Sequence, residues 1–381
     1  MFVIVGAGLA GAKAAETLRE EGYDGRVVLL GAEDERPYER PPLSKEYLRG
    51  EAERESAAVH EAGFYAGHDI ELRTGTAVTA LDAGARELEL HGGERLAFDR
   101  LLLATGAEPR RLRLPGADLD GVHLLRTLAD SDALRRRVNA GGRLAVVGAG
   151  WIGSEVAASA RERGLDVTMI APQSVPLERV LGLEVGGIYA DLHRAHGVEL
   201  RMQAGVAGFE GDGRVERVTL KDGASIDCDA VAVGVGAAPR TALAEAAGLA
   251  VENGVLVDGR LESSVPEIFA AGDVANHLHP AFGRLRVEHW DNALHQGPAA
   301  ARAMLGSGEP YARTPYFFSD QYDVGMEYSG FATAWDQVVL RGDPAAFEFN
   351  AYWLAGDQVV AQMGVNAPLT ELSTVSKGGA P

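Results

Sequence analysis

The chain begins Met1-Phe2-Val3-Ile4-Val5-Gly6-Ala7-Gly8-Leu9-Ala10-Gly11, an apolar run that leads directly into a glycine-rich turn. The apolar run predicts a buried parallel strand, and the turn is typical of the start of a dinucleotide-binding helix. Gly6 permits a tight turn, Gly8 lets a pyrophosphate approach the backbone, and Gly11 allows close packing of the helix. The unpaired N–H groups at this helix end would bind the phosphates.

The same pattern occurs a second time. Leu144-Ala145-Val146-Val147 is followed by Gly148-Ala149-Gly150-Trp151-Ile152-Gly153. One glycine motif is a weak signal, but two copies in the same strand-turn-helix context favour two separate dinucleotide sites. Each predicted helix leads to another apolar strand, over residues 26–30 in the first copy and 166–170 in the second.

Two carboxylates indicate which dinucleotide each copy binds. Glu33 follows the second strand of the first copy, where a carboxylate accepts hydrogen bonds from an adenosine ribose, and Asp34 is the second choice. Far downstream, the apolar run 268–271 ends in Gly272 and Asp273, and this carboxylate is placed to bond the ribityl chain of a flavin. The first copy is therefore predicted to bind FAD and the second a nicotinamide dinucleotide.

This assignment predicts an α/β fold with one dinucleotide-binding domain nested in another. At 381 residues the chain is too long for one core, since single cores stop growing at roughly 250–300 residues. The expected FAD domain covers 1–112 and 240–313, and the expected NAD(P)H domain covers 113–239. Alternating apolar residues after that predict a small C-terminal α+β domain over 314–381, which we expect to serve as an interface domain.

Composition excludes several functions. Cys228 is the only cysteine, so neither an intramolecular disulfide nor dithiol chemistry is available, and no metal site is predicted. The net charge of −19 opposes binding to nucleic acid or anionic membranes. No signal peptide and no membrane-spanning run is predicted, so we expect a cytoplasmic protein. An acidic protein partner would need a local basic patch, for which 110–113 and 135–137 are the candidates.

A third stretch carries more specific information. It is Pro37-Tyr38-Glu39-Arg40-Pro41-Pro42-Leu43-Ser44-Lys45, and the stretches 104–107, 125–128, 288–293 and 315–321 accompany it. Together they resemble the FAD-dependent ferredoxin and rubredoxin reductases that serve bacterial P450 and Rieske oxygenase systems. The resemblance covers about residues 1–365 and implies Rossmann-like domains in a glutathione-reductase-like architecture.

The resemblance also implies roles for single residues. Lys45 and Glu155 would be the catalytic pair, with Lys45 against the flavin ring. A buried ammonium favours reduced flavin, and the carboxylate compensates its charge when the flavin is oxidised. The implied FAD contacts are the Ala10 backbone, Glu33, Arg40, Lys45, Val78, Arg126, Asp273 and Trp290. The other cofactor-binding candidates are Gly6, Gly8, Gly11, Ala104, Thr105, Gly106, Gly148, Gly150, Ile152, Gly153, Glu155, Gly236, Gly272 and His289.

Two of these assignments have alternatives. Trp290 is either a core residue or an aromatic at the flavin edge. His289 is either a proton donor or, as we favour, a hydrogen-bonded residue at the rim of the site.

The implied activity is electron transfer from NADH or NADPH through FAD to a [2Fe-2S] ferredoxin or a rubredoxin, and then to a P450 or Rieske oxygenase. The expected assembly is a monomer or a weak homodimer. Two alternatives remain open: a flavin-dependent monooxygenase or other NAD(P)H oxidase of the same fold, and a flavoprotein that senses NAD(P)H without ferredoxin turnover.

The sequence departs from the family pattern at three places. Ala171 stands where the family commonly places an acidic residue that binds the NADH ribose, although the family pattern still slightly favours NADH. Phe318 stands where the family often has tryptophan, and the sequence ends sooner than the family pattern leads us to expect.

Overall fold

The computed structural model describes residues 1–369, which form two compact units. Unit 1 comprises Met1–Glu39, Glu55–Glu108 and Ala238–Pro315. Unit 2 comprises Arg40–Arg54, Pro109–Ala237 and the described residues from Tyr316 onward. Residues 370–381 of the predicted C-terminal domain lie outside the described residues, and the domain boundaries drawn from the sequence stay a prediction.

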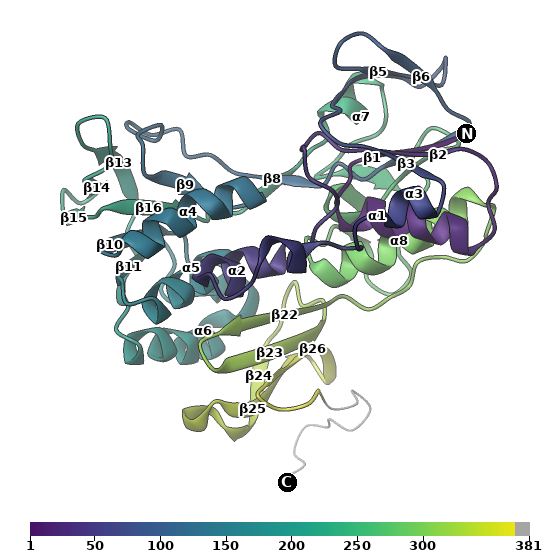
Figure 1. Ribbon diagram of the computed structural model, residues 1–381. Helices are drawn as coiled ribbons and strands as arrows, with labels where there is room; N and C mark the ends of the chain where they lie inside the picture. The colour runs from purple at the N-terminus through teal and green to yellow at the C-terminus, as the bar shows by residue number, and fades with distance from the viewer. Residues whose placement is uncertain (370–381) are drawn as a thin grey trace. The chain divides into compact units, whose positions relative to one another are not determined.

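Unit 1 is built on a five-stranded parallel sheet with the strand order β19-β7-β1-β2-β3 (Figure 1). All four residues of β1 are buried, as a parallel strand in a covered sheet requires. The five strands are β1 (Phe2–Val5), β2 (Val27–Leu30), β3 (Ile70–Arg73), β7 (Arg100–Leu103) and β19 (Ile268–Ala270).

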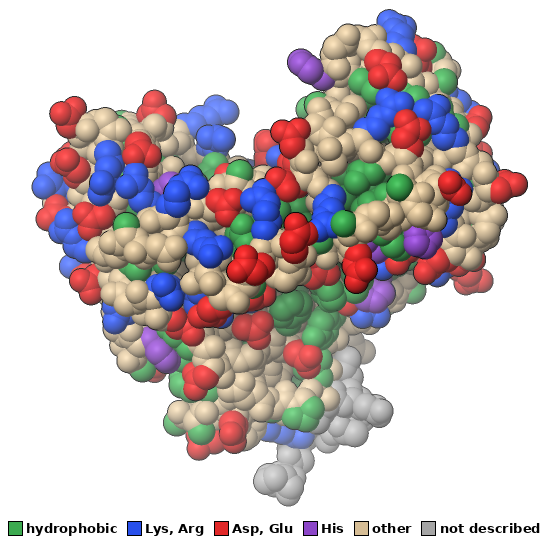
Figure 2. Space-filling view, viewed as in Figure 1, with side chains coloured by type: hydrophobic (Ala, Val, Ile, Leu, Met, Phe, Trp, Pro, Cys, Tyr) green, Lys and Arg blue, Asp and Glu red, His purple; other side chains and the backbone are tan. Residues whose placement is uncertain are grey.

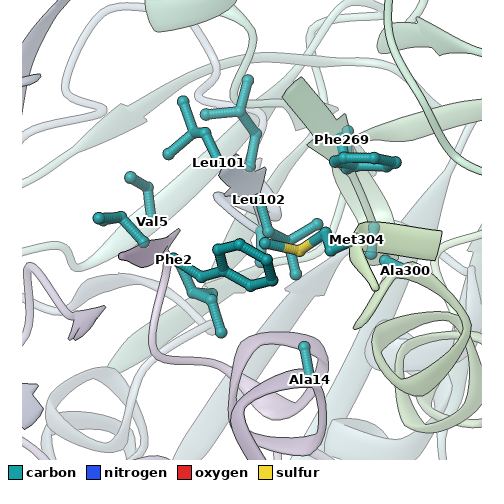
Figure 3. Packing of buried hydrophobic residues seen from close by; sticks show 14 of the residues in the cluster. Phe2, Val5, Ala14, Leu101, Leu102, Phe269, Ala300 and Met304 are labelled. Atoms are coloured by element: carbon teal, nitrogen blue, oxygen red, sulfur yellow. The ribbon is translucent and has the colours of Figure 1, made fainter. Parts of the chain in front are cut away.

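Two helices, α1 (Leu9–Glu20) and α8 (Trp290–Met304), pack along each other in unit 1. Their backbones approach closely because α8 has Gly297 at the contact, where a Cβ would lie 2.2 Å from the carbonyl oxygen of Ala10. Figure 3 shows the core nearby, in which Phe2 and Leu102 of the sheet lie with Met304 of α8.

The remaining elements of unit 1 surround this sheet. A three-stranded antiparallel sheet joins β4 (Val78–Asp82), β5 (Glu87–Leu90) and β6 (Arg95–Ala97). A second three-stranded sheet joins β18 (Val255–Val257), β20 (Ala275–His279) and β21 (Gly283–Leu285). The short helices are α3 (Phe64–Gly67), α7 (Ala242–Ala246) and the 3-10 helix η3 (Gly272–Val274).

Unit 2 repeats the parallel architecture, with the strand order β12-β11-β10-β16-β9. These strands are β9 (Val122–Leu124), β10 (Arg143–Val147), β11 (Asp166–Ala171), β12 (Glu199–Met202) and β16 (Ala230–Val233). The helix α5 (Trp151–Glu162) follows β10, as α1 follows β1. The helix α4 (Leu128–Ala140) begins with a capping box, in which Thr127 accepts from the N–H of Asp130 and the Asp130 carboxylate accepts from the N–H of Thr127.

The C-terminal part of unit 2 is a five-stranded antiparallel sheet packed against the helix α6 (Glu178–Ala195). Its order is β22-β23-β26-β25-β24, visible in green and yellow in Figure 1. Trp353 is fully buried in this interface and donates to the carbonyl of Leu181, 3.2 Å away. The strands are β22 (Tyr316–Gln321), β23 (Val324–Gly330), β24 (Gln337–Asp343), β25 (Glu348–Ala355) and β26 (Gln358–Val365).

Other short elements complete the fold. Unit 2 contains the antiparallel strands β13 (Val206–Glu210), β14 (Arg217–Leu220) and β15 (Ser225–Asp227), the helix α2 (Glu46–Arg49), and the 3-10 helices η1 (Pro41–Ser44) and η4 (Pro344–Ala346). The 3-10 helix η2 spans Arg54–Ala57. The short strands β8 (Ala107–Pro109) and β17 (Ala237–Pro239) pair where the chain passes between the units.

The predicted fold class is confirmed: two parallel sheets of the dinucleotide-binding type are accompanied by a smaller C-terminal sheet with its covering helix. Within residues 1–369, no helix combines the length and the apolar character that crossing a bilayer requires.

His193 should make the stability of unit 2 depend on pH. Its side chain on α6 is fully buried with Nδ1 3.2 Å from the Tyr322 hydroxyl, and burial lowers the pKa of His193 to about 4. Below pH 6.5 the unfolded chain takes up a proton that the folded chain refuses, so the free energy of unfolding falls until the pH reaches the folded pKa. This group contributes a loss of about 2 kcal/mol between pH 7 and pH 5.

Denaturant titrations at both pH values measure this effect. The variant His193→Gln should lose about 2 kcal/mol less than the unmodified protein over the interval. It should retain some acid sensitivity, because burial also lowers the pKa of His277 and the pKa of His289 to about 4 each. Equal losses in both proteins would contradict the assignment.

Candidate functional site

The first glycine turn joins β1 to α1 through a close backbone contact. Gly6 has φ +116°, and a Cβ there would lie 2.1 Å from the carbonyl oxygen of Ala104. A Cβ on Gly11 would lie 2.0 Å from the oxygen of Gly6. Both positions therefore accept only glycine, and together they set the start of α1 against the ends of the strands.

The second turn, between β10 and α5, has nearly the same geometry. Gly148 has φ +110°, and its Cβ would lie 2.2 Å from the oxygen of Gly234. A Cβ on Gly153 would lie 2.1 Å from the oxygen of Gly148. The repeat seen in the sequence is thus a repeat in three dimensions.

The middle glycine of each turn differs from the other two. Gly8 and Gly150 are the N-cap residues of α1 and α5, and neither makes a side-chain cap. A Cβ at either position would meet no protein atom within 4 Å. This open space in front of uncapped helix N–H groups fits a pyrophosphate, which would take the place of the missing cap.

The carboxyl ends of neighbouring strands bring the other candidates of unit 1 together. Glu33 follows β2, Ala104–Gly106 follow β7, and Gly272 and Asp273 follow β19 in η3. β2 and β7 flank β1, and β19 lies beside β7 in the same parallel sheet, so the predicted residues lie along the edge that carries the first glycine turn. Ligands of open α/β sheets bind at this edge.

Glu33 is held in place by a neighbour. The hydroxyl of Tyr38 donates to Oε2 of Glu33 at 2.5 Å, which orients this carboxylate. Asp34, the second choice from the sequence, is exposed. Tyr38 lies in the motif 37–45, but the sequence gave no reason to connect it with Glu33.

His289 and Trp290 lie at the start of α8. His289 is the N-cap residue and is half-buried, and the surrounding protein lowers the pKa of His289 to about 4. The imidazole is therefore neutral at physiological pH and holds no second proton to donate there. Trp290 is hydrogen-bonded to the Glu39 carboxyl, and burial raises the pKa of Glu39.

Unit 2 contains a buried ion pair between the two predicted catalytic residues. The Nζ atom of Lys45 lies 2.9 Å from Oε2 of Glu155, and their side chains are 9% and 5% exposed. The Phe318 ring centroid lies 5.7 Å from Nζ, within the range of a cation–π interaction. The pair joins the segment after η1 to α5, which are distant in the sequence.

The end of β11, the strand that follows α5, has no acidic side chain at position 171. Ala171 ends β11 and is buried, and Gln173 and Ser174 follow in the loop. The nearby Glu178 carboxylate accepts the N–H groups of Ser174 and Val175, at 2.6 Å and 3.3 Å. This carboxylate is therefore occupied in holding the loop.

The remaining candidates lie at identifiable positions in their own units. In unit 1, Val78 begins β4, and the Thr105 hydroxyl donates to the carbonyl of Arg240. In unit 2, Arg40 donates to the carbonyl of Arg126, while Ile152 on α5 is 45% exposed. Gly236 follows β16 and has φ +100°.

Two serines with contacts to Glu155 were not assigned from the sequence. Ser44 and Ser319 both donate to its carboxylate, and each lies in a stretch that carried the family resemblance. Their motifs were a signal, but nothing in either stretch pointed to the other. Among residues 1–369, no group of three or more His, Cys, Asp or Glu side chains is placed to hold a metal ion.

Comparisons with known proteins find matches over most of the chain. Residues 1–297 match the model of the pyridine nucleotide-disulphide oxidoreductase family, and residues 316–373 match a reductase C-terminal model. The chain is 39% identical to rhodocoxin reductase of Rhodococcus erythropolis, over 96% of this chain and 86% of that protein. It is 40% identical to an anthranilate 1,2-dioxygenase system ferredoxin–NAD(+) reductase component of Burkholderia cepacia, over 96% and 90%.

A solved structure is similar over almost the whole chain. It is a covalent complex of putidaredoxin reductase with putidaredoxin, matched with a TM-score of 0.93 at 38% identity. The match covers 96% of this chain and 89% of the other.

The glycines of the first turn should respond differently to alanine. Gly8→Ala should leave the free energy of unfolding of the ligand-free protein within about 1 kcal/mol of its original value, because its Cβ meets open space. It should nevertheless weaken dinucleotide binding, because the methyl group enters the proposed phosphate space. Gly6→Ala should lower the free energy of unfolding of the ligand-free protein several times more than Gly8→Ala does, since the Cβ at position 6 would meet backbone atoms.

Calorimetric titration with the dinucleotide and denaturant unfolding without it separate the two effects. Equal stability of the two variants would contradict the structural role of Gly6. If Gly8→Ala binds the dinucleotide as tightly as the unmodified protein, the phosphates do not bind at this turn.

Proposed function

The chain belongs to the pyridine nucleotide-disulphide oxidoreductase family, among its ferredoxin reductases, and we propose that it carries electrons from NAD(P)H through FAD to a [2Fe-2S] ferredoxin. The observation that carries the proposal is the repeated glycine turn, which offers one uncapped helix N-terminus in each unit. Two such turns in one chain suit an enzyme that uses two dinucleotides.

The residues of the first turn suit FAD. Bound FAD would supply the redox chemistry that links the two-electron donor NAD(P)H to a one-electron ferredoxin. Gly8 leaves space for the pyrophosphate. We assign Glu33 to the adenosine ribose and Asp273 to the ribityl chain, as the sequence predicts. The turn at Gly150 in unit 2 takes the pyrophosphate of NAD(P)H.

Lys45 and Glu155 supply the charge control. We assign Lys45 to the flavin ring, as the family resemblance implies, where its ammonium favours added negative charge. Glu155 compensates this ammonium inside a dry site, because an unpaired buried cation costs several kcal/mol. His289 is a neutral imidazole near pH 7, because burial lowers the pKa of His289 to about 4, and the absence of a second proton supports its assignment as a residue at the rim.

The electron acceptor belongs to the proposal as well. Putidaredoxin is the partner of the similar solved complex, and the relative from Burkholderia cepacia is named for a dioxygenase system. We assign a small [2Fe-2S] ferredoxin as the direct acceptor, with rubredoxin as an alternative substrate, and a P450 or Rieske oxygenase as the final one. A monomer or weak homodimer in the cytoplasm, where metabolism regenerates NAD(P)H, completes the proposal.

Charge places a condition on ferredoxin binding. The net charge of −19 repels an acidic partner, so docking requires local positive charge. Arg110, Arg111 and Arg113 are exposed, whereas Arg137 is paired with Asp120 at 2.6 Å. Figure 2 shows acidic and basic side chains interspersed on the visible face.

A turnover assay tests the function. The purified protein should be yellow with bound FAD, and it should reduce cytochrome c with NAD(P)H only when a [2Fe-2S] ferredoxin is added. Consumption of NAD(P)H that follows an organic substrate and oxygen would assign a monooxygenase instead. A stable complex with NAD(P)H and no turnover with any ferredoxin would assign a sensor.

The residue at position 171 should control the choice between NADH and NADPH. Ala171→Glu places a carboxylate where it can bond the ribose hydroxyls of NADH and repel a 2′-phosphate. We expect kcat/KM with NADPH to fall at least about tenfold relative to kcat/KM with NADH. Ala171→Gln, of equal size and no charge, is the matched control. Equal ratios in both variants would show that this strand end does not face the ribose.

A further inference from the structure

The carboxylate of Glu155 accepts bonds from three side chains in a nearly dry site. Glu155 itself is only 4% exposed. Its Oε2 accepts from Lys45 at 2.9 Å and from the Ser44 hydroxyl at 2.5 Å. Its Oε1 accepts from the Ser319 hydroxyl at 2.7 Å. Both oxygens are therefore bonded, but by donors of different origin.

The donors to Oε2 belong to a segment that is anchored independently. Ser44 and Lys45 are consecutive, and two further hydroxyls hold this segment by its backbone. Ser159 on α5 donates to the carbonyl of Ser44 at 2.7 Å, and Ser131 on α4 donates to the carbonyl of Leu43 at 2.9 Å. Neither of these two bonds involves a residue of the C-terminal sheet.

The donor to Oε1 comes from the C-terminal sheet. Ser319 is on β22, 164 residues after Glu155, and is 1% exposed. The side-chain amide of Gln321, two residues along the same strand, donates to its Oγ at 3.4 Å. Because Oγ accepts from Gln321, its own proton is free to point at Glu155.

This asymmetry has an energetic consequence. A hydrogen bond to a charged group contributes about 1.5–3 kcal/mol, and a buried acceptor that loses its donor incurs a desolvation cost. Without Ser319, the carboxylate keeps Oε2 bonded but loses the donor that fixes its rotation. The ammonium of Lys45 then faces a partner whose direction is no longer set.

We propose that Ser319 is a positioning residue, through which the C-terminal sheet sets the orientation of the Lys45–Glu155 pair. This inference rests on the proposed function, in which the pair controls charge at the flavin. It gives β22 a part in the chemistry in addition to any part in binding a protein partner. Ser44 sets the position of Oε2, and Ser319 sets the rotation of the Glu155 carboxylate about its last side-chain bond.

Three variants test the proposal. Ser319→Ala removes the donor, and Ser319→Thr restores a hydroxyl. Ser329→Ala makes the same change on β23 of the same sheet, at a half-buried residue that belongs to neither proposed cofactor site. The readouts are the rate of flavin bleaching by NADH without ferredoxin, the flavin midpoint potential, and thermal unfolding of the holoprotein.

We expect bleaching to be about tenfold slower in Ser319→Ala, which corresponds to about 1.4 kcal/mol of activation free energy. The midpoint potential should shift as well, Ser319→Thr should recover both properties, and Ser329→Ala should match the unmodified protein. A merely structural role would lower thermal stability without a shift of the potential.

Two outcomes would overturn the proposal. The first is a Ser319→Ala variant whose bleaching rate and flavin midpoint potential equal those of the parent protein, while the parent protein itself is reduced normally. The second is a slow Ser319→Ala variant that Thr does not rescue. If neither NADH nor NADPH bleaches the flavin of the parent protein, the proposed function is wrong, and this inference, which rests on it, is wrong as well.

Discussion

The structure depends on a contact that leaves room for a hydrogen atom and nothing larger. At Gly6 and at Gly148, the backbone passes so close to the neighbouring strand that a Cβ would lie little more than 2 Å from a carbonyl oxygen. These contacts fix where each helix begins relative to its sheet. The phosphate positions at Gly8 and Gly150 follow from that placement, because a helix that started one residue later would present different N–H groups.

Much of the fold could be predicted because its signals are local. The apolar strands before each glycine turn are buried on both faces, so they appear in the sequence as continuous runs. The resemblance to ferredoxin reductases, the fold class and the two cofactors are confirmed. Glu33 and Asp273 were proposed from a local signal as well, because each follows an apolar strand directly in the sequence, and their roles stay predictions.

The contacts of Glu155 could not be predicted in full, because they are not local. Lys45 was paired with Glu155 only through the family resemblance. The serines that complete the site lie 111 residues before Glu155 and 164 residues after it. Serine hydroxyls have no periodic or compositional signal, and only the packing of β22 against α5 reveals the contact. Likewise, nothing near Glu33 indicated that Tyr38 would hold it.

Because Ser319 belongs to the C-terminal sheet, this sheet cannot be exchanged freely for that of another protein. The C-terminal sheet, which begins at Tyr316, would look like an exchangeable part that evolution or an engineer could replace to suit a new electron acceptor. A replacement sheet that lacked a hydroxyl at the position of Ser319 could pack correctly and still leave the buried Glu155 carboxylate without one of its hydrogen-bond donors. Whether a C-terminal sheet is compatible with the rest of the chain therefore depends partly on buried residues, on which selection for a partner protein does not act.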